Sequence, residues 1–170
     1  MSKAFTREDD ARPEQPEIIE RAVTLPEGAR NSITPGGAAC LRAELSNLTE
    51  TERPRLTNQN DPESKRQLTL LDRRIGELHA ALQSAEVVFP PAAPHDRVRF
   101  GATVTVREPS GEKARYRIVG AAEIDPERDW VSWMSPIARS LLNARLGEKV
   151  RFKFPSGETE LAIIAIEYES

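Results

Sequence analysis

Two scarcities limit what this protein can be, because it has a single cysteine and no long apolar segment. Cys40 on its own cannot form an intrachain disulfide framework or a cysteine-based zinc site. No run approaches the roughly 18 apolar residues that cross a bilayer, and Met1–Asp10 lacks the apolar centre of a signal peptide. The sequence therefore predicts a cytoplasmic protein that has no membrane partner.

A strong charge of either sign is also missing. The net charge is −3, although charged residues make up 30% of the chain. Residues 1–32 sum to −2, residues 33–88 to −1 and residues 89–170 to zero. A protein that binds free DNA or RNA normally has a basic face. We therefore expect a protein partner and no binding to free nucleic acid.

Two ladders of apolar residues repeat every three or four positions. The first comprises Ala38, Leu41, Leu45 and Leu48, and the second comprises Leu68, Leu71, Ile75, Leu78, Leu82 and Ala85. This heptad spacing places an apolar stripe on one face of a helix. A break of about six residues, Thr57–Pro62, separates the two helices, so they should fold back on each other. We predict an antiparallel coiled-coil hairpin over residues 33–88, with Leu41 opposite Leu82 and Leu48 opposite Ile75.

Capping residues indicate where the two helices begin and end. Thr34 is a suitable N-cap and Pro35 suits a first turn, which predicts a first helix that runs to Leu56. Asp61 is the predicted N-cap of the second helix, with Pro62 in its first turn. The segment between the helices is the tip of the predicted hairpin.

Pro54 is the irregular residue of the first helix. A proline removes a backbone hydrogen bond, so Pro54 should bend or loosen the last turn. Glu52 and Arg55 fall on the heptad seam in this turn. The regular repeat therefore predicts a polar seam near the tip.

The rest of the chain should divide into a tail, a linker and a second domain. Residues 1–32 have few large apolar side chains and several prolines, which predicts a disordered tail. Residues 89–95 contain three prolines and read as a linker. Over residues 96–170 the apolar period changes to two, as in strands. The predicted strands are Val98–Phe100, Thr103–Val106, Tyr116–Val119, Val150–Phe154 and Leu161–Ile166.

One helix interrupts these strands. Ser135 is its predicted N-cap, Pro136 lies in its first turn, and Ile137, Leu141 and Leu142 should face inward. The predicted fold class is α+β, with a helical hairpin followed by a twisted antiparallel sheet that packs against one helix.

Several stretches in this order are typical of one bacterial family. In the C-terminal half they are FGATVTV (Phe100–Val106), YRIVG (Tyr116–Gly120), SPIARSLL (Ser135–Leu142) and the PSGE and IEY segments of the last hairpin (Pro155–Glu158, Ile166–Tyr168). In the hairpin they are ITPGGAACLRAEL (Ile33–Leu45), ERP (Glu52–Pro54) and LDRRI (Leu71–Ile75). Residues 33–170 thus resemble the Gre transcription elongation factors, GreA and GreB.

The resemblance implies an accessory factor of bacterial RNA polymerase that is not itself an enzyme. Gre factors bind the rim of the polymerase secondary channel through an FKBP-like C-terminal domain and insert the hairpin towards the active site. Acidic residues at the tip help to hold the second Mg²⁺ of the polymerase, which then hydrolyses the 3′ end of a backtracked RNA. The resemblance implies no stably bound cofactor, only an Mg²⁺ shared with the polymerase.

The tip departs from the family pattern. Asp61 and Glu63 are its carboxylates, and their i, i+2 spacing across a proline replaces the i, i+3 spacing of the family. Against the family, the chain is also shorter by about fourteen residues between Pro54 and Asp72, or about one heptad in each arm. The loss of reach is about 10 Å.

Metal ligation tolerates errors of only a few tenths of an ångström. We therefore expect that the protein stimulates cleavage of the RNA weakly or not at all, and that it acts by occupying the secondary channel. The alternative is a working cleavage factor that uses Asp61 and Glu63. Both carboxylates also suit an ordinary role at the start of a helix.

Two other sites are candidates for contact with the partner. The resemblance assigns Met134, Ser135 and Pro136 to the polymerase contact, with Met134 in place of the usual Asp or Asn. Arg66 and Arg73 lie one heptad apart on the outer face of the second helix, where they are either solvated or contact RNA or polymerase. Trp130 and Trp133 flank the Met134 turn and belong either to the core or to an interface.

Two other functions use the same features. An FKBP-like domain could be a prolyl isomerase, which needs a pocket lined by aromatic side chains. Aromatic residues are only 5% of the chain, which argues against this function. A structural adaptor would use the apolar seam between two chains, which predicts a dimer. An intramolecular hairpin predicts a monomer, and we expect a monomer.

Overall fold

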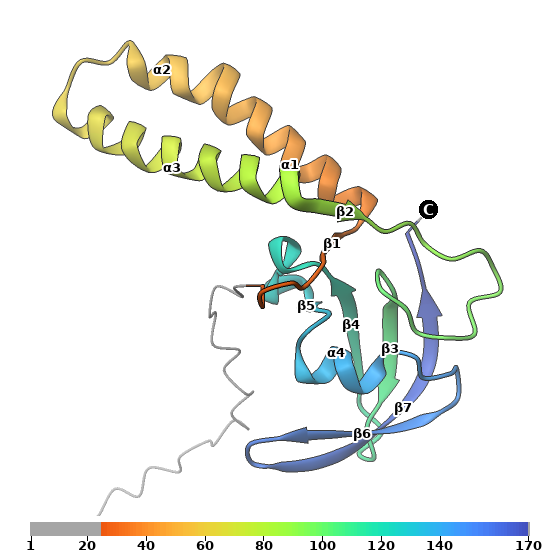
Figure 1. The fold of residues 1–170 in the computed structure, drawn as a ribbon. Helices are drawn as coiled ribbons and strands as arrows, with labels where there is room; N and C mark the ends of the chain where they lie inside the picture. The colour runs from red at the N-terminus through yellow and green to blue at the C-terminus, as the bar shows by residue number, and fades with distance from the viewer. Residues whose placement is uncertain (1–24, 170) are drawn as a thin grey trace, which may run out of the picture.

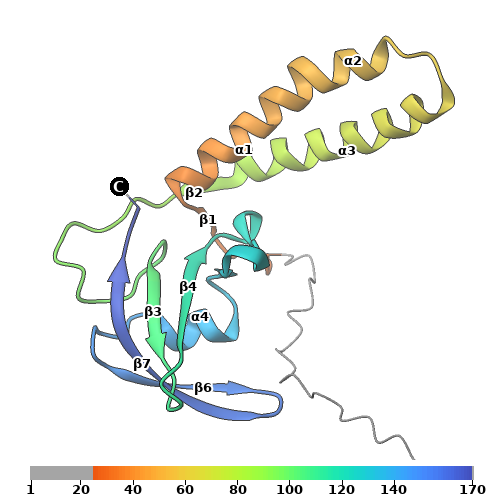
Figure 2. The ribbon, with the colours of Figure 1, turned by 180° about the vertical axis from the view of Figure 1, so that it is seen from behind.

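The computed structural model describes residues 25–169, which form a long helical hairpin and a sheet domain at one end of it (Figure 1). The two arms of the hairpin lie side by side, and their tip points away from the sheet domain, as the opposite view also shows (Figure 2). Most of the expected tail, residues 1–24, lies outside the described residues. Within residues 25–169, none of the helices combines the length and apolar character needed to span a bilayer.

The first arm is one helical rod with a widened turn. It comprises α1 (Pro35–Asn47), a π-helical turn η1 (Leu48–Glu52) and α2 (Arg53–Thr57). Pro54 explains the wide turn, because its ring nitrogen cannot donate and its ring collides with the carbonyl four residues earlier in a regular helix. In the structure the Arg53 amide donates to the Leu48 carbonyl, five residues earlier. The irregularity thus lies in the turn before Pro54, one turn earlier than predicted, while the last turn, α2, is α-helical.

The wide turn also shifts the apolar stripe by one residue. A π-helical turn holds about one residue more than an α-helical turn, so later positions rotate relative to a regular heptad. Leu56 is buried between the arms, whereas Arg55 is exposed and pairs with Glu52 on its own arm. The predicted polar seam at Arg55 is therefore wrong, and a leucine anchors the last turn before the tip.

The second arm is α3 (Pro62–Ser84), which starts at the predicted N-cap Asp61. Its apolar ladder faces the first arm, because Leu78 is only 1% exposed and shares a buried cluster with Leu41. Two ion pairs also join the arms, Arg74–Glu44 at 2.8 Å and Arg53–Asp72 at 2.7 Å. The hairpin is thus an antiparallel pair of helices, while the supercoiling of a true coiled coil stays a prediction.

A short parallel pair of strands lies at the base of the hairpin. β1 (Asn31–Ile33) pairs with β2 (Ala85–Val87), so the chain just before the first arm contacts the chain just after the second. The Ile33 side chain is 2% exposed in the hairpin cluster, and its carbonyl accepts from the Val88 amide at 2.9 Å. The sequence did not indicate this pair, and β1 includes two residues of the expected tail.

The sheet domain contains a curled sheet of five strands in the order β5-β4-β3-β7-β6. Their bounds are β3 Thr103–Arg107, β4 Lys113–Val119, β5 Trp130–Ser132, β6 Lys149–Phe154 and β7 Gly157–Glu167. Four of the five predicted strands lie within β3, β4, β6 and β7, which pair antiparallel as predicted. The mixed α+β class is confirmed, while the FKBP-like description rests on the family resemblance.

Two details of the predicted sheet are wrong. Residues 98–100 form no strand, because Val98 makes only bridging hydrogen bonds with the segment after α4 and a turn follows at Gly101. β5 was not predicted, and it runs parallel to β4. Two 3₁₀ turns, η2 (Ala121–Glu123) and η3 (Pro126–Arg128), reverse the chain between β4 and β5, which makes this parallel pairing possible.

The core of the sheet domain lies between the sheet and α4 (Pro136–Leu141). Alternate strand residues face inward, as the period of two predicts, and Val104, Val106 and Leu141 are fully buried. The predicted helix start is confirmed, because the Ser135 hydroxyl accepts from the Ala138 amide at 3.3 Å. The opposite face of β3 and β6 is polar or charged.

Leu78→Ala tests whether the apolar stripe holds the hairpin together. It removes a side chain that is 1% exposed, so we expect the free energy of unfolding to fall by about 2–5 kcal/mol. Leu70 lies on the same helix but is 67% exposed, and Leu70→Ala should change this free energy by less than about 0.5 kcal/mol. Urea unfolding followed by helical circular dichroism measures both. Equal losses would contradict the assignment of Leu78 to the seam.

Candidate functional site

The tip of the hairpin is a short polar loop held by side-chain hydrogen bonds. The Asp61 carboxylate accepts from the Ser64 amide at 2.9 Å and from the Ser64 hydroxyl at 2.7 Å, through different oxygens. The Ser64 hydroxyl also lies 2.9 Å from Oε1 of Gln59, and the Gln59 amide donates to the Leu56 carbonyl at 3.2 Å. Ser64 is buried, whereas Asp61 is exposed. The capping role predicted for Asp61 is therefore present.

These hydrogen bonds favour the charged form of Asp61. Both the hydroxyl and the amide of Ser64 donate to its carboxylate, and together they lower the pKa of Asp61 below its usual value. The start of α3 adds the partial positive charge of a helix N-terminus. The carboxylate is thus anionic at neutral pH and oriented along its own helix.

Glu63 is the second predicted metal ligand. Its carboxylate is exposed on the first turn of α3 and accepts a hydrogen bond from the Gln67 side chain at 3.2 Å. Carboxylates suit Mg²⁺, but a complete site needs six ligands. Nowhere in residues 25–169 do three or more His, Cys, Asp or Glu side chains gather as a metal site would require. Asp61 and Glu63 can only contribute to a site whose other ligands come from elsewhere.

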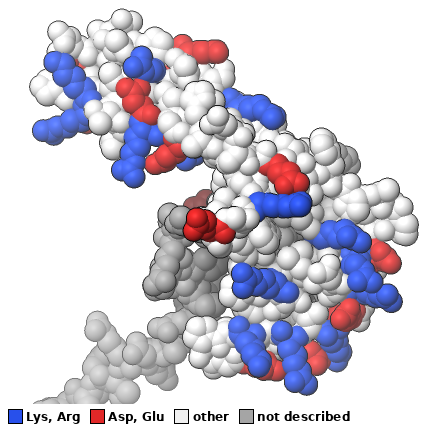
Figure 3. Space-filling model, viewed as in Figure 1, with Lys and Arg blue, Asp and Glu red and all other residues white. Residues whose placement is uncertain are grey.

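The two predicted contact arginines lie on the exposed side of α3. Arg73 pairs with Glu77 one helical turn away at 3.2 Å, and its side chain is 79% exposed. Arg66 is exposed near Leu70, one of the few large apolar side chains that reach solvent in the described residues. Figure 3 shows basic and acidic side chains interspersed along this view of the hairpin and sheet domain. The face shown has no large patch of one sign.

The Met134 turn connects the end of β5 to α4. Its conformation is fixed locally, because the Met134 amide donates to the Ser132 hydroxyl at 3.2 Å and Ser135 caps α4. Pro136 is exposed in the first turn, where its missing N–H costs nothing. The turn therefore presents a rigid, partly exposed surface, as a contact site requires.

The two tryptophans beside this turn have different surroundings. Trp133 is half-buried against the core of the sheet domain. Trp130 lies under two arginines, with the guanidinium carbons of Arg117 and Arg128 at 4.3 and 5.4 Å from its ring centre. Of the two alternatives, the core assignment fits Trp133, and Trp130 forms cation–π contacts within the domain.

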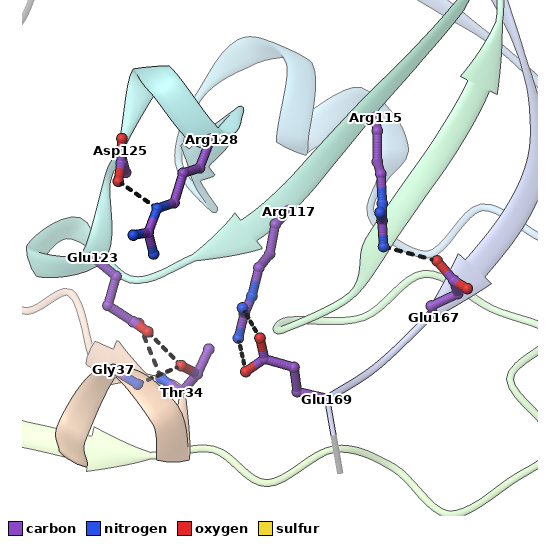
Figure 4. A network of polar contacts seen from close by, with 9 residues as sticks. All are labelled: Thr34, Gly37, Arg115, Arg117, Glu123, Asp125, Arg128, Glu167 and Glu169. Atoms are coloured by element: carbon purple, nitrogen blue, oxygen red, sulfur yellow. Dashed lines mark hydrogen bonds and ion pairs between the residues drawn. The ribbon is translucent and has the colours of Figure 1, made fainter. Parts of the chain in front are cut away.

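The contact between the hairpin and the sheet domain contains residues that the sequence reasoning missed. The Glu123 carboxylate, at the end of η2, accepts from the Thr34 amide at 2.9 Å and from the Thr34 hydroxyl (Figure 4). Thr34 in turn caps α1, because its hydroxyl oxygen accepts from the Gly37 amide at 3.0 Å. Two glycines in succession at a helix start were a signal that another group approaches closely there.

A second carboxylate lies beside the same helix start. Glu169 forms a bidentate ion pair with Arg117 of β4 (Figure 4). The Nη2 of Arg117 lies 2.6 Å from Oε2 of Glu169. The Arg117 side chain is only 8% exposed, and its guanidinium stacks on Trp130. A Cβ added to Gly36 would come within 3.2 Å of the Glu169 carboxylate. Both carboxylates therefore lie close to the first turn of α1.

A pocket of about 210 Å³ lies at this contact. It is lined by Thr34, Pro35, Gly36, Val88, Phe89, Pro90, Gly101, Arg117 and Glu169. Phe89 is the one aromatic side chain in this lining, and it is 73% exposed. The pocket therefore lacks the aromatic walls expected of a prolyl isomerase.

Comparisons with known proteins agree on one family. The family model described as "Transcription elongation factor, GreA/GreB, C-term" matches residues 93–168. The chain is 38% identical to Transcription elongation factor GreB of Pseudomonas aeruginosa over 150 residues, covering 80% of this chain and 89% of that one. It is 37% identical to GreB of Neisseria meningitidis serogroup B over 154 residues, covering 82% and 94%. A solved GreA/GreB structure from Nitrosomonas europaea aligns with a TM-score of 0.42 and 23% identity, covering 81% and 98%.

The lowered pKa of Asp61 predicts a pH dependence of hairpin stability. Asp61 should stabilise the fold above its unfolded pKa of about 3.9, and this contribution should be lost as the pH falls through the lower folded pKa. Asp61→Asn keeps a good cap but cannot ionise, so its stability deficit at neutral pH should vanish at acid pH. Urea midpoints measured across this pH range test the prediction. Ser64→Ala removes the hydroxyl donor and should weaken the dependence, and an unchanged profile in both variants would contradict it.

Proposed function

Because the chain belongs to the GreA/GreB family of transcription elongation factors, we propose that it binds bacterial RNA polymerase and inserts its hairpin into the secondary channel. The sheet domain docks at the rim of the channel, and the tip points towards the active site. The protein acts as an accessory factor and leaves the chemistry to the polymerase. The tip projecting away from the sheet domain supports this arrangement (Figure 1).

The hairpin acts by occupying the channel more than by promoting cleavage of the transcript. The observation that carries this proposal is the state of the Asp61 carboxylate, both of whose oxygens accept hydrogen bonds from Ser64. To ligate Mg²⁺ well, Asp61 would have to give up or share these bonds, and the cap of α3 would weaken.

The length of the hairpin also favours channel occupancy over cleavage. α3 has 23 residues, which corresponds to about 34 Å of helix. A hairpin shorter than its relatives by about one heptad in each arm ends about 10 Å earlier. Coulombic attraction from that distance is weak in a wet channel, and ligation needs contact. A hairpin that is too short to reach the active site, and whose Asp61 carboxylate already caps α3, therefore competes with cleavage factors for the same channel.

Docking involves the Met134–Pro136 turn and the outer face of α3. The turn is rigid and partly exposed, which suits a contact with the channel rim. Arg66 and Arg73 lie along the part of the hairpin that enters the channel, where they meet polymerase or the RNA 3′ end. Their exposure and the outward position of Arg73 support this assignment. The protein acts as a monomer, since its apolar ladder is covered within one chain.

The second candidate is a working cleavage factor. One observation favours it: Glu63 is exposed at the tip and has only the neutral Gln67 side chain as a hydrogen-bond partner within the described residues. Such a carboxylate is free to ligate a metal ion if the tip reaches the active site. Its neighbour Asp61 would then add a second ligand or orient the attacking water.

A transcript-cleavage assay separates the two candidates. We expect little stimulation of cleavage when the protein is added to a stalled, backtracked elongation complex, and no further change with Asp61→Asn/Glu63→Gln. We also expect the unaltered protein to inhibit cleavage that is stimulated by GreB from Pseudomonas aeruginosa. Strong Mg²⁺-dependent cleavage that the double variant abolishes would instead establish the cleavage factor. Failure to bind the polymerase would contradict both candidates.

Pro136→Glu tests the docking surface. The change puts a bulky charge on the exposed first turn of α4, so we expect a loss of polymerase affinity of at least about ten-fold, typical of a contact residue. Folding should be preserved, because the first turn of a helix tolerates most residues. Pro126→Glu is the matched control, since Pro126 is also exposed at the start of a helical turn of the same domain. Equal affinities in the two variants would move the interface elsewhere.

A further inference from the structure

The Glu123 carboxylate lies where the hairpin meets the sheet domain. Glu123 is 7% exposed. Within the described residues, its hydrogen-bond donors belong to Thr34 and Gly120. One oxygen accepts from the Thr34 hydroxyl, while the other accepts from the amides of Thr34 and Gly120, each at 2.9 Å. Thr34 belongs to the hairpin and Gly120 to the sheet domain. The carboxylate therefore links the two parts.

Burying this carboxylate is costly unless its interactions are specific. An ionised carboxylate out of water loses favourable hydration, which hydrogen bonds must replace. Within residues 25–169 Glu123 has no ion pair, so the three donors and the N-terminus of α1 supply this compensation. The donors reach the Glu123 carboxylate only when the hairpin has one orientation relative to the sheet domain. The hydrogen bonds therefore fix the direction of the hairpin as well as hold it against the sheet domain.

Two glycines allow the close approach. A Cβ on Gly37 would overlap the Glu123 carboxylate, and a Cβ on Gly120 would overlap the carbonyl oxygen of Ser32. Gly37 lies on the hairpin side of the contact and Gly120 on the sheet side. The backbones of the two parts are therefore packed as closely as glycine permits.

The Arg117–Glu169 pair of the sheet domain packs beside the start of the same helix. The Glu169 carboxylate lies close to Gly36. Glu123 lies against Thr34 and Gly37 (Figure 4). The packing contact at Gly36, on a second side of the first turn of α1, restricts rotation of the hairpin about the Glu123 contact.

We propose that Glu123 is the positioning residue that fixes the direction of the helical hairpin relative to the sheet domain. The hairpin amplifies any error at this contact, because a rotation of about 10° displaces the end of a helix of about 34 Å by about 6 Å. A channel would not accept the tip after such a displacement. Only this consequence rests on the proposed function, whereas the positioning itself concerns the free protein.

Distance measurement in the free protein tests the proposal. Spin labels are placed at the tip by Asn60→Cys and in the β3–β4 turn by Ser110→Cys, in a Cys40→Ala background; all three positions are exposed. Pulsed electron paramagnetic resonance should give one narrow distance distribution for this parent. Glu123→Ala should lose the narrow peak, and Glu123→Gln, which can still accept from both amides, should broaden it less. Glu127→Ala, an exposed carboxylate in the same connection, is the control and should keep the peak.

Amide hydrogen exchange gives an independent reading. In both Glu123 variants, the Thr34 and Gly120 amides should exchange about ten-fold faster or more, because their shared acceptor is lost or weakened. Amides of β3 and β7 should keep their protection, which distinguishes loss of positioning from loss of the fold. Gly37→Ala should act like Glu123→Ala by displacing the carboxylate.

Three results would overturn the proposal. The first is a narrow, unshifted distance peak in Glu123→Ala. The second is global loss of protection in Glu123→Gln as well as Glu123→Ala, which would make Glu123 a general stability residue. The third is broadening in Glu169→Ala alone, which would assign the positioning to Arg117 and Glu169. None of these results depends on whether the protein binds polymerase.

Discussion

The hydrogen bonds that the buried Glu123 carboxylate accepts from Thr34 and Gly120 connect the two parts of this molecule. The same Thr34 hydroxyl that donates to Glu123 accepts from the Gly37 amide, so the start of α1 and the contact between domains form one chain of hydrogen bonds. Charge-assisted bonds of this kind are about twice as strong as neutral ones. The direction of the first arm, and hence the position of the tip, therefore depends on a residue about sixty positions beyond that tip.

The elements that could be predicted from the sequence are those whose signals are local. The leucine ladders, the caps at Thr34, Asp61 and Ser135, and four of the five predicted strands depend on neighbours within a few residues. β1 and β5 have three residues each, too few to show a period. β1 pairs with a strand far away in the sequence, and β5 runs parallel to the strand before it, which a simple hairpin does not allow. Glu123 was missed because a single glutamate in a sequence normally indicates a solvated side chain. Its burial follows from a contact between residues 89 positions apart.

The candidate site divides in the same way. The family resemblance proposed the tip carboxylates and the Ser135 turn as site residues, whereas their capping roles could be predicted from residue type. The sequence left open whether Asp61 caps a helix or is free to bind a metal ion, since the same residue suits both. The structure adds that both Asp61 oxygens accept bonds from one residue, Ser64. Each oxygen keeps a second lone pair, but the donors already bound to it weaken its attraction for a cation, so the cap and the metal compete for the same oxygens.

Pro54 shows how the hairpin can still end in an ordered tip. In a regular helix this proline would break the hydrogen-bond ladder and leave Arg55 on the seam. The π-helical turn η1 absorbs the missing bond and rotates the following residues, so that Leu56 takes the inner position. With a leucine beneath the loop, the Gln59 amide and the Ser64 hydroxyl can hold the tip from both arms. The tip is therefore a packed end of the hairpin, and its shape is set by Pro54 as much as by its carboxylates.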